Sequence, residues 1–212
     1  MKRTLGTFFL TISLTIFAQE NIDYLNEGNN LLNQNKPDEA ELIFNKGLEK
    51  NPENLVLKSQ VALAQMNQQK FSDAQETLNQ ILKADSSNIA ALWYSGVNNY
   101  IQKPPKLREA IKYFELAYPL IDKNSGQYFG VNYFIGNSYK FLLYKEGLSY
   151  GEVDRMLETL KLYTKLQPNA DDTELTANFI AKVEKLRPPK NVEKWIITTE
   201  KNASKVLKEN LK

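Results

Sequence analysis

The chain has 212 residues, of which 42% are hydrophobic and 25% are charged, so it can bury the core of one or two domains. Its 9 glycines and 8 prolines are few for this length. This argues against an all-β or loop-rich protein, because such folds need turn residues about every ten positions. The 27 basic and 25 acidic residues nearly balance, so the net charge gives no support for nucleic-acid binding.

Residues 1–18 have the pattern of a secretory signal peptide. Lys2 and Arg3 are followed by an apolar stretch from Leu5 to Phe17, and then the sequence turns polar. The apolar stretch, about 13 residues long, is too short to cross a bilayer as a retained anchor. We therefore predict cleavage at the end of this segment, within a residue or two, and a periplasmic or secreted mature chain with no integral membrane segment.

The sequence contains no cysteine and no histidine. Disulfides and cysteine nucleophiles are therefore excluded, and the commonest general base and metal ligand is missing. Acidic residues cluster at Asp38-Glu39 and at Asp171–Glu174, but both clusters stand at predicted helix starts, where carboxylates stabilise the helix. The second cluster resembles a capping box. We predict a non-enzymatic protein with no catalytic residue, no metal site and no cofactor.

One spacing of residues recurs after about 34 positions, a period typical of helix–turn–helix arrays. The first set is Tyr24, Gly28, Leu31, Ala40, Phe44, Gly47 and Pro52, and the second is Lys58, Ala62, Gln65, Ala74, Leu78, Ile81 and Ser86. The small residues stand where paired helices would approach closely. The pattern predicts units at 21–54, 55–88 and 89–124 and a divergent unit at 125–170.

The third and fourth units are longer than the first two. In the third, Lys103-Pro104-Pro105 lengthens the turn, and we expect the second helix to resume at Leu107 or Arg108. The fourth has about eight surplus residues. We expect the region from Phe141 to Tyr150 to extend a helix, a loop or both.

This spacing resembles the tetratricopeptide repeat family, strongly over residues 21–124 and weakly over 125–170. The resemblance implies an all-α helix–turn–helix solenoid, wound as a right-handed superhelix, with a concave groove lined by the first helix of each pair. It also implies a scaffold or adaptor that binds a peptide or helix of another protein. By analogy with exported members of the family, this one would act in the cell envelope, although fold alone does not fix function.

Residues 171–212 predict two further helices. The first carries Leu175, Phe179 and Val183 on one face, and the second runs from about Asn191 to Leu211. We expect both to cap the end of the solenoid. The alternatives are a detachable partner-binding helix and a helix that occupies the protein's own groove.

The resemblance also selects candidate residues on the inner surface. The partner-binding candidates are Asn29, Trp93, Tyr100, Tyr133 and Asn137. Tryptophan and tyrosine are favoured at interfaces because they bury much area with few rotatable bonds, and Asn29 could bond the backbone of an extended peptide. The alternative for the aromatic residues is a place in the core. The alternative function is a small-ligand or glycan-binding module with an aromatic pocket in the third and fourth units.

Overall fold

The computed structural model describes residues 23–197, and the predicted signal peptide lies outside them. This part of the chain contains nine α-helices, one 3₁₀ turn and no β-strand, which confirms the all-α prediction for these residues. The elements are α1 (Tyr24–Asn33), α2 (Pro37–Lys50), α3 (Leu55–Asn67), α4 (Phe71–Ala84), α5 (Ile89–Ile101), α6 (Leu107–Ala117), η1 (Tyr118–Leu120), α7 (Gly126–Lys145), α8 (Tyr150–Leu166) and α9 (Thr173–Leu186). None of these helices combines the length and apolar character needed to span a membrane.

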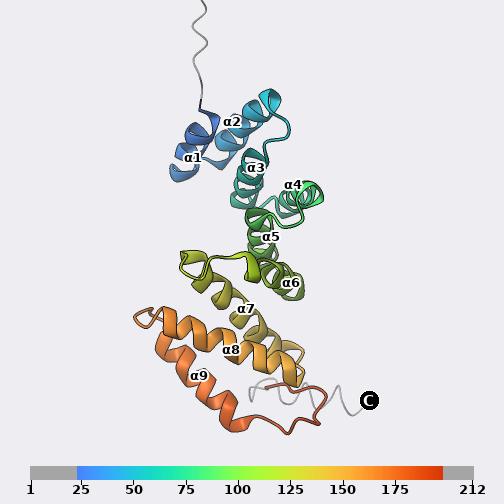
Figure 1. Cartoon of the computed structure of the whole chain (residues 1–212), viewed down its shortest axis with the longest axis vertical. Coiled ribbons are helices and arrows are strands. Elements are labelled where there is room, and N and C mark those ends of the chain that lie inside the picture. Colours follow the sequence, from blue (N-terminus) through green and yellow to red (C-terminus); the bar gives the residue numbers. More distant parts are fainter. Residues whose placement is uncertain (1–22, 198–212) are drawn as a thin grey trace, which may run out of the picture.

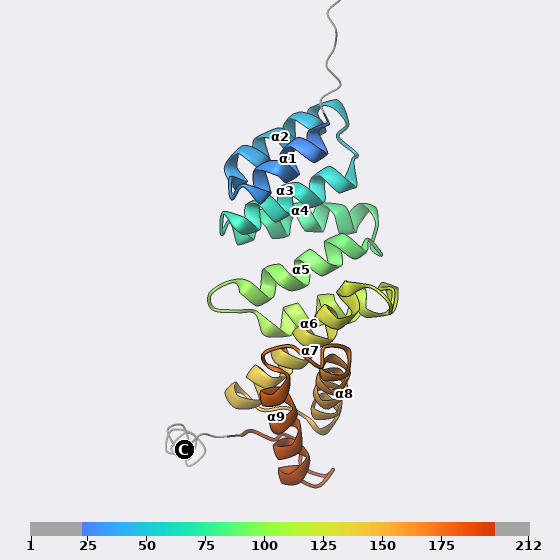
Figure 2. The ribbon, with the colours of Figure 1, turned by 90° about the vertical axis from the view of Figure 1, so that its left-hand side faces the viewer.

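The helices stack as pairs along one long axis (Figure 1). α1 packs on α2, α3 on α4, α5 on α6 and α7 on α8, and α9 lies against α8 at the end of the stack. Each pair also contacts the next, through α2 and α3, α4 and α5, and α6 and α7. Figure 2 shows the same order from the side, with α1 and α9 at opposite ends. The helix–turn–helix solenoid is therefore the observed architecture.

Several helices begin where the sequence contains a start signal. Pro37 is the first residue of α2, where its missing N–H leaves no helical hydrogen bond unmade. Asn54 and Asn88 cap α3 and α5, because their side chains accept hydrogen bonds from backbone N–H groups of the first turn. These start signals determine where the helices begin and keep the connections before them short.

The capping box predicted at Asp171–Glu174 is wrong. Asp172 precedes α9, but its side chain makes no capping hydrogen bond. Its Oδ1 atom instead accepts a hydrogen bond of 2.7 Å from the Tyr163 hydroxyl. The capping box of this region lies at the start of α8, where the side chains of Ser149 and Glu152 bond each other's backbone N–H groups.

A glycine marks the close approach inside three of the four helix pairs. The glycines and the side chains that face them are Gly28 with Phe44, Gly96 with Phe114, and Gly136 with Leu160. A Cβ atom added to the glycine would overlap the facing side chain in each pair, at a distance of 2.5 Å in the last two. Small residues are therefore required at these positions for the helices to pack.

The fourth pair is the longest. α7 has 20 residues and α8 has 17, so the surplus residues lengthen the helices, and only Glu146–Ser149 remain as a turn. Gly147 has a φ of 80° in this turn, a backbone conformation that residues other than glycine rarely adopt. The longer helices contribute to the largest cluster of buried apolar side chains, which extends from α5 to α9.

The helix predicted from Asn191 is not present as far as Ile197. The Pro188-Pro189 pair cannot continue α9, and the next residues bond elsewhere. Trp195 and Leu148 exchange two N–H···O=C hydrogen bonds of 2.8 Å, so this segment lies on the turn between α7 and α8. The remainder of the predicted helix lies outside the described residues.

Candidate partner-binding groove

Aromatic side chains of the third and fourth helix pairs converge on Phe134 of α7. Its ring centroid lies 5.0 Å from that of Tyr100 and 5.7 Å from that of Trp93, both on α5. Tyr133 adjoins at 5.5 Å, and the Phe114 ring of α6 stacks at 5.0 Å. Phe114 is buried, whereas the other four side chains remain partly exposed. This aromatic cluster therefore has one side in the core and one side toward solvent.

The structure brings three of the predicted site residues together, places Asn29 far from them and buries Asn137. Trp93, Tyr100 and Tyr133 all belong to the aromatic cluster. Asn29 lies on α1, which packs on α2 and α3 at the far end of the stack. Asn137 lies on α7 but is only 9% exposed, and its side-chain amide donates a hydrogen bond to the backbone carbonyl of Tyr133.

Trp93 also packs helices together. A Cβ atom added to Gly130 would lie 2.7 Å from the Cη2 atom of Trp93, so the indole rests directly on the backbone of α7. Its ring also meets that of Phe114 in a T-shaped contact, at a centroid distance of 5.7 Å. Trp93 therefore joins the third pair to the fourth, and a substitution there affects stability as well as binding.

A hollow of about 450 Å³ lies beside the aromatic cluster, where α5 ends and α7 passes it. Its lining includes Tyr100, Ile101, Lys103, Leu107, Phe141 and Lys145. Ile101 is 41% exposed and Phe141 is 56% exposed, so the hollow presents apolar surface to solvent. We call it the lysine hollow.

A second hollow, of about 480 Å³, lies between α7 and the connection from α8 to α9. Its lining includes Phe129, Tyr133, Phe134, Tyr163, Asp171 and Asp172, and none of its lining residues is basic. The rings of Tyr133 and Tyr163 meet edge to face at 5.1 Å. We call it the aspartate hollow.

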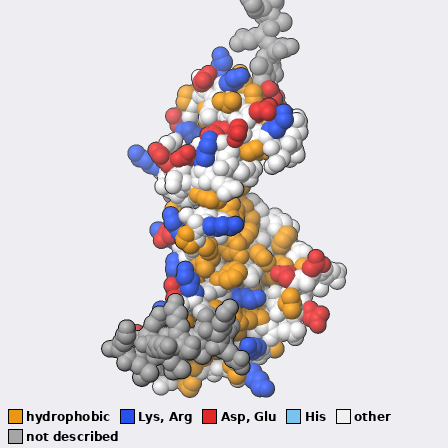
Figure 3. Space-filling model, turned by 180° about the vertical axis from the view of Figure 1, so that it is seen from behind, with side chains coloured by type: hydrophobic (Ala, Val, Ile, Leu, Met, Phe, Trp, Pro, Cys, Tyr) orange, Lys and Arg blue, Asp and Glu red, His pale blue; other side chains and the backbone are white. Residues whose placement is uncertain are grey.

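Phe134 connects the two hollows. It lines the aspartate hollow, and its ring contacts Tyr100, which lines the lysine hollow. Seen from behind, the middle of the molecule carries a band of apolar surface, whereas the lobe above it carries many charged side chains (Figure 3). We call the two hollows and the aromatic cluster between them the groove.

A larger hollow near the start of α2 is a weaker candidate. It measures about 710 Å³, and none of its lining residues is aromatic. Its polar side chains already bond one another, since Glu41 accepts a hydrogen bond of 2.7 Å from Gln68 and pairs with Lys70 at 3.3 Å. These groups have less capacity left to recognise a partner.

Tyr100 and Tyr163 stay neutral at physiological pH, because the pKa of each hydroxyl is raised. Burial, with a smaller contribution from the nearby Tyr133, raises the pKa of Tyr100 to about 12. Burial also raises the pKa of Tyr163, and its hydrogen bond to Asp172 raises it further. These hydroxyls can donate or accept hydrogen bonds, but the charge of the groove comes from its lysines and aspartates.

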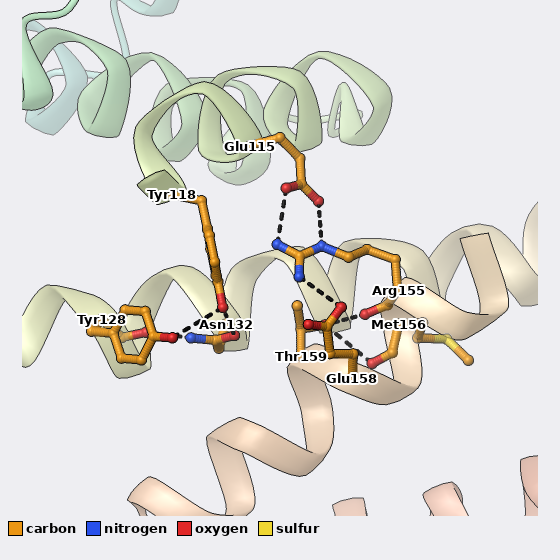
Figure 4. A network of polar contacts seen from close by, with 8 residues as sticks. All are labelled: Glu115, Tyr118, Tyr128, Asn132, Arg155, Met156, Glu158 and Thr159. Atoms are coloured by element: carbon orange, nitrogen blue, oxygen red, sulfur yellow. Dashed lines mark hydrogen bonds and ion pairs between the residues drawn. The ribbon is translucent and has the colours of Figure 1, made fainter. Parts of the chain in front are cut away.

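A polar network joins the helices that frame the groove (Figure 4). Arg155 of α8 donates hydrogen bonds of 2.8 and 2.9 Å to the two carboxylate oxygens of Glu115 on α6. Its guanidinium also lies 4.4 Å from the ring centroid of Tyr118. The Tyr118 hydroxyl in turn donates a hydrogen bond of 3.4 Å to Oδ1 of Asn132 on α7. The network therefore ties α6, α7 and α8 to one another.

Several groove residues were not predicted as site residues, although one signal for them was present. Phe141 and Lys145 follow Phe134 at i+7 and i+11, a spacing that places all three on one face of a helix. Asp171 gave no such signal, because an acidic residue just before a helix is ordinarily explained by capping.

Comparisons with known proteins agree with this architecture. Residues 31–94 match a family model described as tetratricopeptide repeat. A crystal structure of MamA protein has a TM-score of 0.59 and 20% identity over 77% of this chain and 82% of that chain. MamA from Desulfovibrio magneticus RS-1 has a TM-score of 0.57 and 17% identity over 77% and 92% of the two chains. The TPR-like repeats of a putative kinesin light chain from Podosopora anserina have a TM-score of 0.55 and 11% identity over 78% and 96%.

At these identities the solved structures show a shared fold and nothing about partners. A search of curated proteins found no match. The fold defines the chain as an α-helical solenoid, a class suited to protein–protein interaction. The family match identifies tetratricopeptide repeats at residues 31–94 of this solenoid.

Proposed function

We propose that the chain is a non-enzymatic scaffold that binds a peptide or helix of another protein in the groove. The observation that carries this proposal is the exposure of Ile101 and Phe141 beside the partly exposed rings of Tyr100, Phe134 and Tyr133. Apolar surface of this kind is costly in water, and a partner that covers it gains about 25 cal/mol for each Å² buried.

The groove is suited to docking because the helices beneath it are held in place. Phe134 stacks on the buried Phe114, and Arg155 joins α8 to α6. A surface that is already formed loses little conformational entropy when a partner binds. No bond needs to form or break, so the proposed mechanism is the burial of apolar area with hydrogen bonds at the rim.

The place of action is part of the same proposal. Because residues 1–18 have the pattern of a signal peptide, we propose that the mature chain acts as an adaptor in the cell envelope, either periplasmic or secreted. Mass spectrometry of the mature protein tests this step. We expect a chain that begins at or near Gln19, and a chain that keeps its first residues would contradict cleavage.

A second function is favoured by the aspartate hollow alone. Tyr133 and Tyr163 form an aromatic corner beside Asp171 and Asp172, and aromatic surface with a few polar groups is typical of small-ligand sites. A glycan or another small ligand would then be the occupant. The continuity of this hollow with the rest of the groove favours a longer ligand, so we place the peptide first.

Substitution of Phe141 tests the proposed groove. Phe141→Asp puts a charge on the apolar surface without emptying the core, because this side chain is 56% exposed. Leu116→Asp on α6 is the matched control, because Leu116 is 52% exposed and lines neither hollow. Circular dichroism should show the same helix content in both variants.

The two variants are compared in capture experiments from envelope extract. We expect a partner that is retained by the wild type and by Leu116→Asp and is lost from Phe141→Asp. Equal retention by all three proteins would place the binding surface elsewhere.

A further inference from the structure

We infer that the two ends of the groove carry opposite charges. The groove therefore selects a segment of another protein that has an acidic end, an apolar centre and a basic end. This inference rests on the proposed function, because it specifies the partner segment that the groove accepts. Its basis is the opposite charge of the two hollows and the apolar cluster between them.

The lysine hollow is the basic end. Lys103 and Lys145 both line it, and no acidic residue does. Neither lysine forms an ion pair with any residue between 23 and 197. The nearby carboxylates of Glu146 and Glu152 are both held by Arg108. An acidic side chain of a partner would therefore meet two lysines without displacing an existing pair.

The aspartate hollow is the acidic end. Within the described part of the chain, Asp171 and Asp172 have no ion-pair partner. The Tyr163 hydroxyl donates a hydrogen bond of 2.7 Å to Oδ1 of Asp172 and keeps its proton, because burial and this bond raise the pKa of the tyrosine. Carboxylates that share a hollow with the rings of Phe129 and Tyr133 suit a lysine or arginine, since aromatic rings also attract cations.

The distance between the two ends sets the length of the segment. Gly130 lines the aspartate hollow and Lys145 lines the lysine hollow, and both belong to α7. At 1.5 Å per residue, these positions are about 22 Å apart along the helix. An extended segment of about seven residues covers this distance. Its apolar side chains would then lie over Tyr100 and Phe134.

Binding of short peptides to the full chain tests the inference. Three fluorescent peptides of about nine residues share one apolar centre of leucine and tryptophan. The first has glutamates at one end and lysines at the other, the second has glutamates at both ends, and the third has lysines at both ends. We expect the first to bind about fivefold more tightly than the other two, with a difference that shrinks at high salt.

Substitutions of each end should switch this preference. Lys103→Glu combined with Lys145→Glu should weaken binding of the first peptide, which has one acidic and one basic end, and strengthen binding of the peptide with lysines at both ends. Asp171→Lys should weaken binding of the first peptide and strengthen binding of the peptide with glutamates at both ends. This substitution leaves the hydrogen bond between Tyr163 and Asp172 intact. The controls Lys46→Glu and Glu49→Lys lie at exposed positions of α2 and should change no affinity by more than about twofold.

The outcomes separate this inference from the proposed function. If all three peptides bind equally and Phe141→Asp abolishes their binding, the groove binds polypeptides but is not selective for charge, and the inference is wrong. If none of the peptides binds, the inference and the proposed function both fail.

Other occupants of the groove would also overturn the inference. A change of oligomeric state in Phe141→Asp, measured by light scattering, would identify a second copy of the chain as the occupant. Faster hydrogen exchange in residues 198–212 of the same variant, without peptide, would identify the chain's own segment.

Discussion

Single side chains join helices that are distant in the sequence. Arg155 reaches Glu115 across 40 positions, and Glu41 of α2 accepts hydrogen bonds from Gln65 and Gln68 at the end of α3. Charges that are partly removed from water need such partners, because an unpaired charge in the same place is costly. The contribution of each contact to stability can therefore be tested by substitution of one partner.

Arg155→Ala should lower the free energy of unfolding by about 1–3 kcal/mol. The Glu115 carboxylate would lose both of its hydrogen bonds, and Tyr118 would lose the cation beside its ring. Arg155→Lys should recover only part of the loss, because an ammonium group cannot donate two parallel bonds. Urea denaturation measures the effect, with Glu158→Gln as the control. An equal loss in Glu158→Gln would show that the bond to Glu115 is not the important one.

The carboxyl group of Glu41 predicts a dependence of stability on pH. Burial raises its pKa, but hydrogen bonds from Gln68, Gln65 and Lys70 outweigh burial, so the pKa is lowered overall from its ordinary value of 4.5. A lowered pKa stabilises the folded state above pH 4.5, and this contribution is lost as the pH falls through the folded-state pKa. Below pH 4.5 the melting temperature of Glu41→Gln should therefore fall less steeply than that of the wild type. Parallel melting curves would contradict this assignment.

Helices pack in this protein through a repeated contact of a glycine with a large side chain. The repeat spacing predicted that the helices of a pair approach closely at Gly28 and Gly96. The structure places the rings of Phe44 and Phe114 against these two glycines. The segment around Trp195 could not be predicted in the same way. Its apolar residues also fit one face of a helix, and only the pairing with Leu148 determines the extended form.

Gly96→Ala should destabilise the protein by about 1–3 kcal/mol, because the new methyl group would lie 2.5 Å from the buried Phe114 ring. Gly151→Ala on α8 is the matched control, since apart from its chain neighbours and the backbone of its own helix no atom lies within 4 Å of the added methyl group. Alanine is also the better helix former, so this control should be equal to the wild type or slightly more stable. Equal thermal stability of the two variants would show that α5 and α6 can move apart without loss of folding free energy.

The groove is a property of the whole molecule. Trp93, Tyr100 and Tyr133 could be predicted because the repeat register assigns them to first helices. The hollows on either side of Phe134 could not, because they depend on the angle between the third and fourth pairs and on the path of the chain from α8 to α9. Spacing along the sequence contains neither quantity. Asn29 lies far from the aromatic cluster because it belongs to the first pair, and the second pair stands between them in the stack.

The central claim is that a polypeptide partner lies in the groove. Photo-crosslinking tests it most directly, with a photoreactive phenylalanine analogue placed at position 141 or at position 116 of the full chain in the cells that produce it. We predict a crosslinked adduct with a second protein from position 141 and none from position 116. Adducts in equal yield from both positions, or from position 116 alone, would contradict the claim.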